Sequence, residues 1–169
     1  MKRLTLVMAL MAGMASAAQT FEVRTAEATF IEVSQCTVTQ TLITLVQAQT
    51  RITTEYPDGW QRSALITVQV DDTCAGVQLL NAAGQFIATN DLAIDRKLAY
   101  AEFTGLVAVW DGISQAEGQL NVSVTFDGTG PPSRTGHTLS RAADATLAAD
   151  GMGVSLRNTT HAAVLSIAK

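Results

Sequence analysis

Apolar and polar side chains alternate along most of this chain, which is typical of β-strands with one buried and one solvated face. The clearest stretch covers residues 119–127, whose apolar positions are Leu120, Val122, Val124 and Phe126. Residues 64–71 and 161–167 follow the same period of two, and residues 98–111 predict one long strand bent at Gly105. These stretches predict sheet as the dominant structure.

Two further stretches, residues 29–33 and 38–49, are rich in threonine, valine and isoleucine, whose branched side chains fit strands. Turn residues separate the predicted strands, for example at Pro57-Asp58-Gly59 and Asp127-Gly128. The alanine-rich residues 142–149 also have helix propensity, and residues 91–97 are compatible with one helical turn. The whole pattern predicts an all-β fold, either an antiparallel β-sandwich or a partly closed barrel.

The first seventeen residues have the layout of a secretory signal peptide. Lys2 and Arg3 give a positive start, residues 4–14 are apolar but too short to span a bilayer, and residues 15–17 form a small-residue cleavage site. A buried N-terminal helix is the alternative, but this stretch lacks the polar face that such a helix shows. We therefore expect residues 1–17 to be removed and residues 18–169 to form a single secreted or periplasmic β-domain without a transmembrane segment.

The chain has two cysteines, Cys36 and Cys74. Export would place both in an oxidising compartment, where they would pair with each other because there is no third cysteine. In the chain-entropy model, closing a loop of this length stabilises the fold by about 3 to 4 kcal/mol. Zinc binding is the alternative, but two cysteines without a nearby pair of histidines do not complete a zinc site. We predict one disulfide and no metal.

The composition and the net charge of the chain argue against some classes of protein. The chain of 169 residues is 47% apolar and 15% charged, which fits one globular domain and argues against disorder. Its formal net charge of −4 becomes −6 when the two charges of Lys2 and Arg3 are removed. An acidic chain without a basic cluster is not typical of proteins that bind nucleic acids.

Several short motifs, read together, resemble a family of secreted bacterial β-rich proteins to which no function is assigned. They are Cys36-Thr37-Val38, Asp72-Thr73-Cys74 followed by Gln78-Leu79-Leu80, the strand ending in Val109-Trp110-Asp111, and residues 122–130 leading to Ser133-Arg134. In that family the strand before the Gly-Thr-Gly turn usually carries a tryptophan, where this chain has Phe126. A histidine-rich loop follows, of which only His137 remains here. The resemblance implies an all-β fold and the disulfide, and it transfers no catalytic residue.

The sequence shows no catalytic constellation. The Gly-x-Ser-x-Gly turn of exported serine hydrolases is absent, and two prolines follow Gly128-Thr129-Gly130 where a phosphate-binding loop would start a helix. Asp111 and Asp127 precede glycines, where a short carboxylate commonly caps a turn. We expect neither a catalytic residue nor a cofactor. The alternative of a different class is a small secreted hydrolase or carbohydrate-active enzyme that uses Asp111 or Asp127 with His137.

Three residues are candidates for a contact surface. Trp60 follows a polar turn, where an exposed indole can stack on a sugar ring or anchor a protein partner. Arg134 and His137 lie in a predicted loop, and Arg134 and Arg141 are compatible with a small anion patch near His137. Trp110 ends an apolar strand and is expected to pack in the core.

These observations predict a secreted, non-enzymatic binding or surface-associated module. Its partner would be a protein or a carbohydrate, and the residues do not specify which. A subunit of an extracellular assembly, joined to its neighbour through an exposed edge strand, is the alternative within the same broad class.

Overall fold

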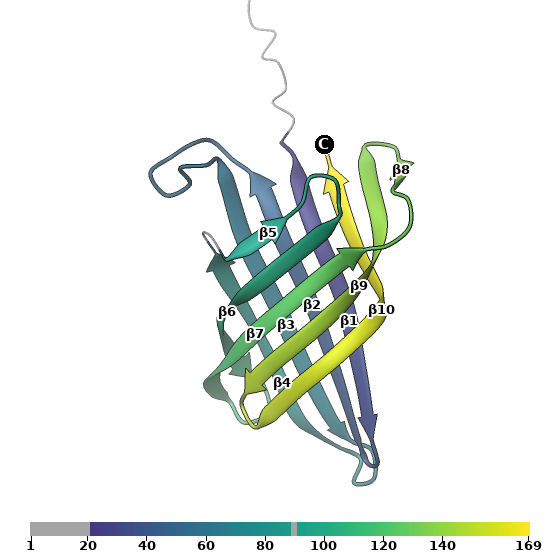
Figure 1. Ribbon diagram of the computed structural model, residues 1–169. Helices are drawn as coiled ribbons and strands as arrows, with labels where there is room; N and C mark the ends of the chain where they lie inside the picture. Colours follow the sequence, from purple (N-terminus) through teal and green to yellow (C-terminus); the bar gives the residue numbers. More distant parts are fainter. Residues whose placement is uncertain (1–20, 89–90) are drawn as a thin grey trace, which may run out of the picture.

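The computed structural model of the protein describes residues 21–88 and 91–169, so the predicted signal peptide, residues 1–17, lies outside the described residues. The described residues form ten strands and no helix (Figure 1). The strands are β1 (Val23–Ser34), β2 (Thr37–Gln49), β3 (Trp60–Asp72), β4 (Val77–Ala88), β5 (Leu92–Ile94), β6 (Tyr100–Asp111), β7 (Ala116–Gly128), β8 (Ser133–Thr135), β9 (Thr138–Gly151) and β10 (Val154–Ala168). The all-β prediction is confirmed. Residues 142–149, which also had helix propensity, belong to β9, and residues 91–97 contain β5 and a turn.

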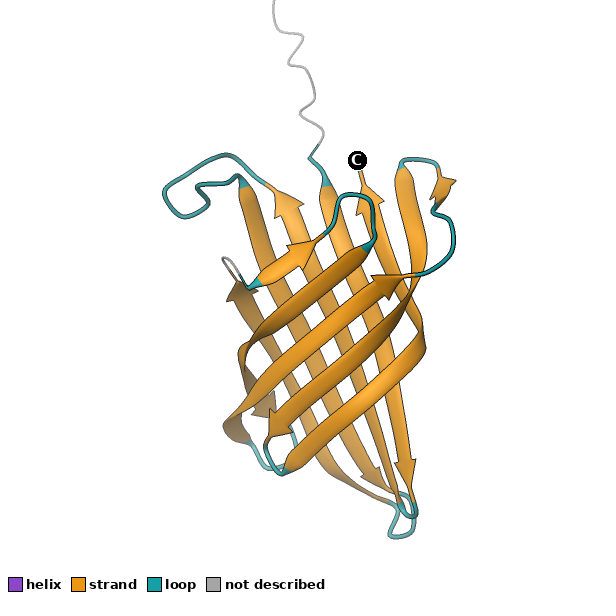
Figure 2. Cartoon of the chain, viewed as in Figure 1, coloured by secondary structure: helices purple, strands orange, loops and turns teal. Residues whose placement is uncertain are grey.

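The strands pair antiparallel in the order β10-β1-β2-β3-β4-β6-β7-β9-β8, and β10 also pairs with β9. This last pairing joins the two ends of the order, so the eight long strands close into a ring (Figure 2). The short strand β5 pairs with β6, and β8 forms a hairpin with β9. The predicted antiparallel fold with one disulfide is thus confirmed, in the form of a single sheet that closes on itself.

The ring is least regular between β4 and β6, which pair at only three positions, from Ala82 opposite Asp111 to Gly84 opposite Val109. The short strand β5 pairs with β6 from Leu92 opposite Phe103 to Ile94 opposite Ala101, so β6 is hydrogen-bonded on this side near both of its ends. Phe86 and Phe103 pack across this point, with ring centroids 5.6 Å apart. The ring is therefore interrupted only along the middle of β6, between these two pairings.

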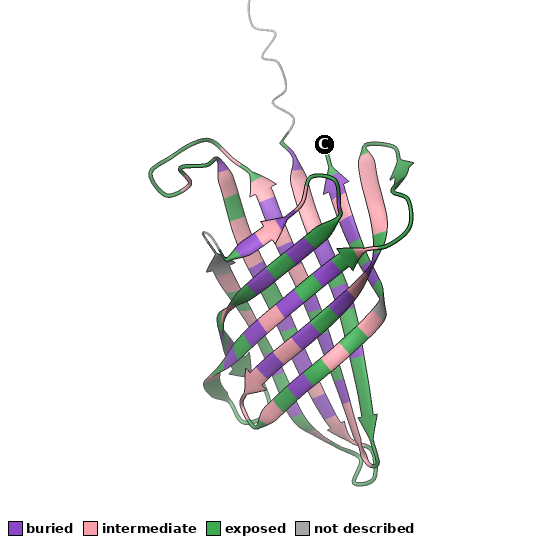
Figure 3. Cartoon of the chain, in the orientation of Figure 1, coloured by how far each residue is buried: buried purple, intermediate pink, exposed green. Residues whose placement is uncertain are grey.

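The core fills the inside of the ring. Along β7, Leu120, Val122, Val124 and Phe126 are buried while their neighbours face solvent, as predicted, and the other long strands show the same alternation (Figure 3). Burying a side chain as large as Phe126 stabilises the fold by roughly 1.5 to 3 kcal/mol, so the inward positions supply the main driving force. Gly105 does not interrupt β6; a Cβ there would lie 2.8 Å from the Phe103 ring, so glycine makes room for that core side chain.

The prediction that Trp110 packs in the core is wrong. In β6 the inward positions are occupied by Val107, Val109 and Asp111, so Trp110 points outward and its side chain is 46% exposed. It lies beside an open depression on the outer surface, over β4, β6 and β7.

No helix among the described residues is long and apolar enough to cross a membrane.

The ring has two different ends. At the turn end, short turns join β1 to β2, β3 to β4, β6 to β7 and β9 to β10 (Figure 1). At the opposite, open end lie the start of β1, the end of β10, the β2–β3 loop, the β5–β6 turn and the β8–β9 hairpin. The two ends carry different chemistry.

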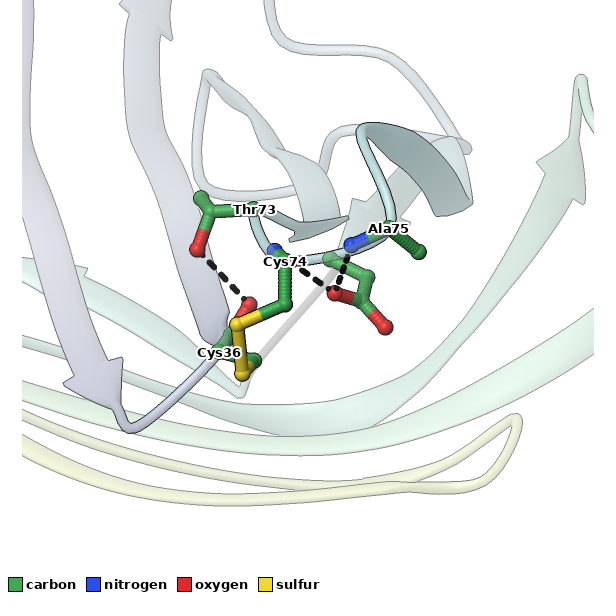
Figure 4. The surroundings of a disulfide bond; sticks show 5 residues. Cys36, Thr73, Cys74 and Ala75 are labelled. Carbon is green, nitrogen blue, oxygen red and sulfur yellow. Dashed lines mark hydrogen bonds between the residues drawn. A yellow bond between two sulfur atoms is a disulfide. The ribbon is translucent and has the colours of Figure 1, made fainter.

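The predicted disulfide between Cys36 and Cys74 lies at the turn end, where it ties the β1–β2 turn to the β3–β4 turn (Figure 4). The two Cα atoms are 5.1 Å apart, a normal separation for a disulfide. The Cys36 carbonyl accepts hydrogen bonds from the amide and the hydroxyl of Thr73, and Asp72 caps the turn by accepting from the amides of Cys74 and Ala75. The bond closes a loop between residues 38 apart in sequence.

Candidate functional site

The open end contains a pocket built from a row of residues that strand pairing places side by side. Arg134 of β8 lies opposite Leu139 of β9, Leu139 lies opposite Ile167 of β10, and Ile167 lies opposite Arg24 of β1. Ile167 is 5% exposed and belongs to the last apolar layer of the core. Above this layer, the inward positions of the strands change from apolar to charged.

The pocket has a volume of about 230 Å³. Its wall combines basic side chains, one carboxylate and two apolar side chains. The lining residues are Glu22, Arg96, Arg134, His137, Leu139, Ile167 and Lys169. A site with this lining can hold an anion over an apolar floor.

The carboxylate of Glu22 is held in place from two sides. Its Oε1 lies 2.7 Å from Nε of Arg24, and its Oε2 lies 3.1 Å from Nζ of Lys169. Burial raises the pKa of Glu22, but the hydrogen bonds and charges of Arg24 and Lys169 outweigh it and leave the pKa below its ordinary value. Glu22 is therefore ionised at neutral pH and fixes one lysine at the pocket wall.

Arg24 connects this carboxylate to Trp60. Its guanidinium Cζ lies 4.4 Å from the centre of the Trp60 ring, and its Nη1 donates to the carbonyl of Ile94 at 2.9 Å. A cation over an indole face is attracted by the ring's negative quadrupole. Trp60 itself does not line the pocket; it supports Arg24, which in turn supports Glu22.

Two tight turns present the remaining basic residues. Arg96 lies in the β5–β6 turn, where the carboxylate of Asp95 accepts hydrogen bonds from the amides of Lys97 and Ala99. His137 follows Gly136, whose φ of 60° lies in the left-handed region that glycine adopts at little cost, in the turn between β8 and β9. Both side chains are thus carried by backbone that local hydrogen bonding or hairpin geometry fixes.

The basic side chains of the pocket differ in their partners. Lys169 is paired with Glu22, whereas the side chains of Arg96, Arg134 and His137 form no hydrogen bond or ion pair within residues 21–88 and 91–169. All three are exposed. Their donors are available to a ligand without breaking an internal contact.

Two acidic residues at the turn end, Asp72 and Asp111, cap turns. Asp111 is buried and accepts hydrogen bonds from the amides of Asn81, Ile113 and Ser114 and from the Ser114 hydroxyl. The Ser114 hydroxyl first, and then these amides, lower the pKa of Asp111 to about 2. Asp111 is a turn cap at the opposite end of the ring from His137, so these two do not form the pair of the alternative hydrolase hypothesis. Asp127, the other acid named for that pair, is an exposed residue of β7.

The sulfurs of Cys36 and Cys74 and the carboxylate of Asp72 lie within 4.8 Å of one another, a grouping that resembles a metal site. The two sulfurs are bonded to each other, so they offer no thiolate to an ion. Asp72 already accepts two amide hydrogen bonds in the turn. The geometry is that of a capped, disulfide-linked turn.

Sequence reasoning identified part of the pocket. Arg134 and His137 were predicted, and the structure brings them together. Trp60 and Arg141 were also predicted, but both lie outside the pocket lining; Arg141 donates to the carbonyl of Leu98 instead. Sequence reasoning missed Glu22, Arg96 and Lys169. Glu22 and Lys169 meet because β1 pairs with β10, from Val23 opposite Ala168 to Ala28 opposite Ala163, and no local motif signals this pairing.

Comparison with known proteins adds little. No family model matches the chain, and no curated protein matches it. Among solved structures, the chain is similar to a protein from Nitrosomonas europaea, provisionally named AttH, with 13% identity and a TM-score of 0.40. The match covers 87% of this chain and 50% of that one, so the chain spans half the length of that protein.

Proposed function

We propose that the protein is an exported, non-enzymatic binding module that takes a small anion into the pocket at the open end of the ring. One observation carries this proposal: Arg96, Arg134 and His137 converge on one pocket with no internal partner among the described residues, in a chain whose net charge is −4. Charge-assisted hydrogen bonds from arginine are among the strongest that a protein makes with anions. Binding of a ligand explains why an acidic chain keeps several basic side chains together.

The position of the pocket supports the same proposal. Glu22 just before β1, the β5–β6 turn, the β8–β9 hairpin and the end of β10 contribute to it, so its walls are set by the closed ring and not by one loop. The Trp60–Arg24–Glu22–Lys169 chain of contacts fixes one side before a ligand arrives. A site that is already organised loses less entropy when it binds.

Binding is tested by isothermal titration calorimetry of the purified protein with acetate, phosphate and hexanoate at low and high ionic strength. We expect at least one of these anions to bind, and its affinity to fall with added salt because the site is partly exposed. Arg134→Gln should weaken binding by about tenfold, since it removes a charged donor. Arg157→Gln is the matched control, because it removes an equal charge from β10 near the turn end, where Arg157 pairs with Asp150 at 2.6 Å.

Two outcomes would overturn the proposal. One is that none of the three anions binds. The other is that Arg157→Gln weakens binding as much as Arg134→Gln, because binding would then depend on overall charge and not on the pocket.

Export is tested separately by mass spectrometry of the protein recovered from the periplasm and the medium. We expect a chain that begins at Ala18 and carries the Cys36–Cys74 bond. The disulfide is compatible with an extracellular or periplasmic location, where such bonds persist. A chain that retains residues 1–17 and is recovered from the cytoplasm would contradict export.

A further inference from the structure

Resting on the proposed function, we infer that the ligand of the open-end pocket is a small monoanion whose charged group is attached to an apolar group, such as a short-chain carboxylate. The inference comes from how the pocket divides. Leu139 and Ile167 form an apolar side, and Arg96, Arg134 and His137 form a basic side. A ligand with both kinds of surface matches both sides.

The apolar side selects against a fully hydrated inorganic anion. Ile167 is 5% exposed and Leu139 packs partly buried against the core, so the two extend the core surface into the pocket. Phosphate keeps its hydration and gains nothing from such a surface, whereas each methylene group removed from water adds about fourfold to the affinity. The tail of the ligand therefore contributes affinity that the charged group alone does not.

The carboxylate of Glu22 limits the charge of the ligand. Glu22 lines the same pocket, and its two oxygens are each engaged by one cation, Arg24 or Lys169. A ligand with two negative charges is repelled by this carboxylate more strongly than a ligand with one. Glu22 thus reduces the gain that a second negative charge would make from Arg96 and Arg134. The apolar side of the pocket, which a second charged group cannot use, then favours a monoanion with an apolar group.

The volume of the pocket limits the size of the apolar group. Pockets for drug-sized ligands have volumes of about 300 to 1,000 Å³, and this one measures about 230 Å³. The apolar group is therefore a short chain or a single branched group, and a long acyl chain would extend into solvent.

The test is a calorimetric series on the wild-type protein with acetate, butyrate, hexanoate and octanoate, with phosphate and hexanol as controls. We expect affinity to rise by up to about fourfold per methylene group and then to level off once the apolar side is covered. Phosphate should bind more weakly than hexanoate, and hexanol, which lacks the charge, should bind more weakly still. This series requires no variant, so impaired folding cannot obscure its result.

Two variants separate the two sides of the pocket. Leu139→Ala should lower the affinity for hexanoate and leave that for acetate unchanged, whereas Arg134→Gln should lower both. Leu106→Ala, which removes an exposed leucine from the outer face of β6, is the matched control and should change neither. Thermal unfolding of each variant verifies that it is folded at the temperature of the titration.

A third variant tests the role of Glu22. Glu22→Gln removes the negative charge and should raise the affinity for phosphate relative to hexanoate. An unchanged ratio in the folded variant would show that Glu22 does not set the charge preference, and would overturn that part of the inference.

The same chemistry occurs in free short-chain acids and in the C-terminus of a peptide that ends in an apolar residue. N-acetylleucine represents the second source in the titration series. Tighter binding of hexanoate identifies a free acid as the ligand, and tighter binding of N-acetylleucine identifies a peptide terminus.

The failures of the two proposals are distinguishable. If acetate and phosphate bind as well as hexanoate and Arg134→Gln weakens them all, the anion site stands and the apolar requirement is wrong. If no anion binds, both proposals fail.

Discussion

At the turn end of the ring, Asp72 and Asp111 accept hydrogen bonds from the amides of their own turns, whereas at the open end Arg96 and Arg134 have no internal partner among the described residues. The turn end also carries the disulfide and an excess of acidic residues. Those near it are Glu32, Asp71, Asp72, Asp111, Glu117 and Asp150, with Arg157 as the basic residue. Charged groups therefore have two different roles in this protein. Those with hydrogen-bond partners inside the protein, such as Asp72 and Asp111, stabilise the fold, whereas those without such partners, such as Arg96 and Arg134, are available to a ligand.

The largest difference between the ends should appear when the disulfide is removed. The double variant Cys36→Ser, Cys74→Ser should lower the free energy of unfolding by about 3 to 4 kcal/mol, because the unfolded chain regains the entropy of the open loop. Urea denaturation followed by circular dichroism measures this loss. Under conditions where the variant remains folded, its anion affinity should equal that of the wild type; a reduced affinity would contradict the separation of the two ends.

A smaller loss of stability is expected at the open end. Glu22→Gln should lower the free energy of unfolding by about 1 to 2 kcal/mol, mainly because Arg24, whose side chain is 12% exposed, loses a charged partner. The pair with Lys169, which is 55% exposed, contributes less. Glu32→Gln is the control, since Glu32 is exposed near the turn end. If both substitutions cost the same, Glu22 has no special structural role.

Asp111 should account for part of the stability that the protein loses as the pH falls into the acid range. The fold lowers the pKa of Asp111 from 3.8 to about 2, so its contribution is fully present above its unfolded pKa and is lost as the pH falls through the folded value. The difference in melting temperature between the wild type and Asp111→Asn should therefore shrink from pH 5 down to about pH 2. A difference that stays constant over this range would contradict the assignment of Asp111 as an ionised turn cap. Asp127→Asn is the control, because Asp127 is an exposed residue of β7 and not a turn cap.

The smallest effect concerns Trp60. Trp60→Leu keeps an apolar side chain but removes the aromatic face beneath Arg24, which should cost about 0.5 to 1 kcal/mol of stability. Trp110→Leu is the matched control on the outer face and should cost less. Urea denaturation at neutral pH measures both, and an equal cost would show that the contact between Arg24 and Trp60 contributes nothing.

Most of the fold could be predicted from the alternation of apolar and polar residues along the chain. The inward positions of β7 and β3 are those that alternation assigned, because burial of one face repeats at every second residue. Closure of the sheet into a ring could not be predicted, because it depends on β1 pairing with β10 and on β6 pairing with both β4 and β5. These are long-range pairings with no local motif.

The same limit explains what was missed in the pocket. Arg134 and His137 are close in sequence and could be grouped, whereas Glu22 and Lys169 come together only when the ring closes. The sequence held one indication of this site. Glu22 and Arg24 lie at the same alternate positions as the buried Ala26, Ala28 and Phe30 of β1, so their side chains point to the inside of the ring. Charged residues at such positions indicate where the apolar core ends. The error over Trp110 has a similar origin, since an apolar residue was assigned to the core without its parity being followed along β6.

The most direct test of the central claim, that the open end binds and the turn end stabilises, is an NMR titration of the labelled protein with hexanoate, recorded as amide chemical-shift changes. We expect saturable changes at residues of the pocket, led by Arg134, His137, Leu139 and Ile167, with the amides around Asp72 and Asp111 unmoved. Changes centred on the outer face near Trp110 or on the turn end, or no saturable change at all, would contradict it.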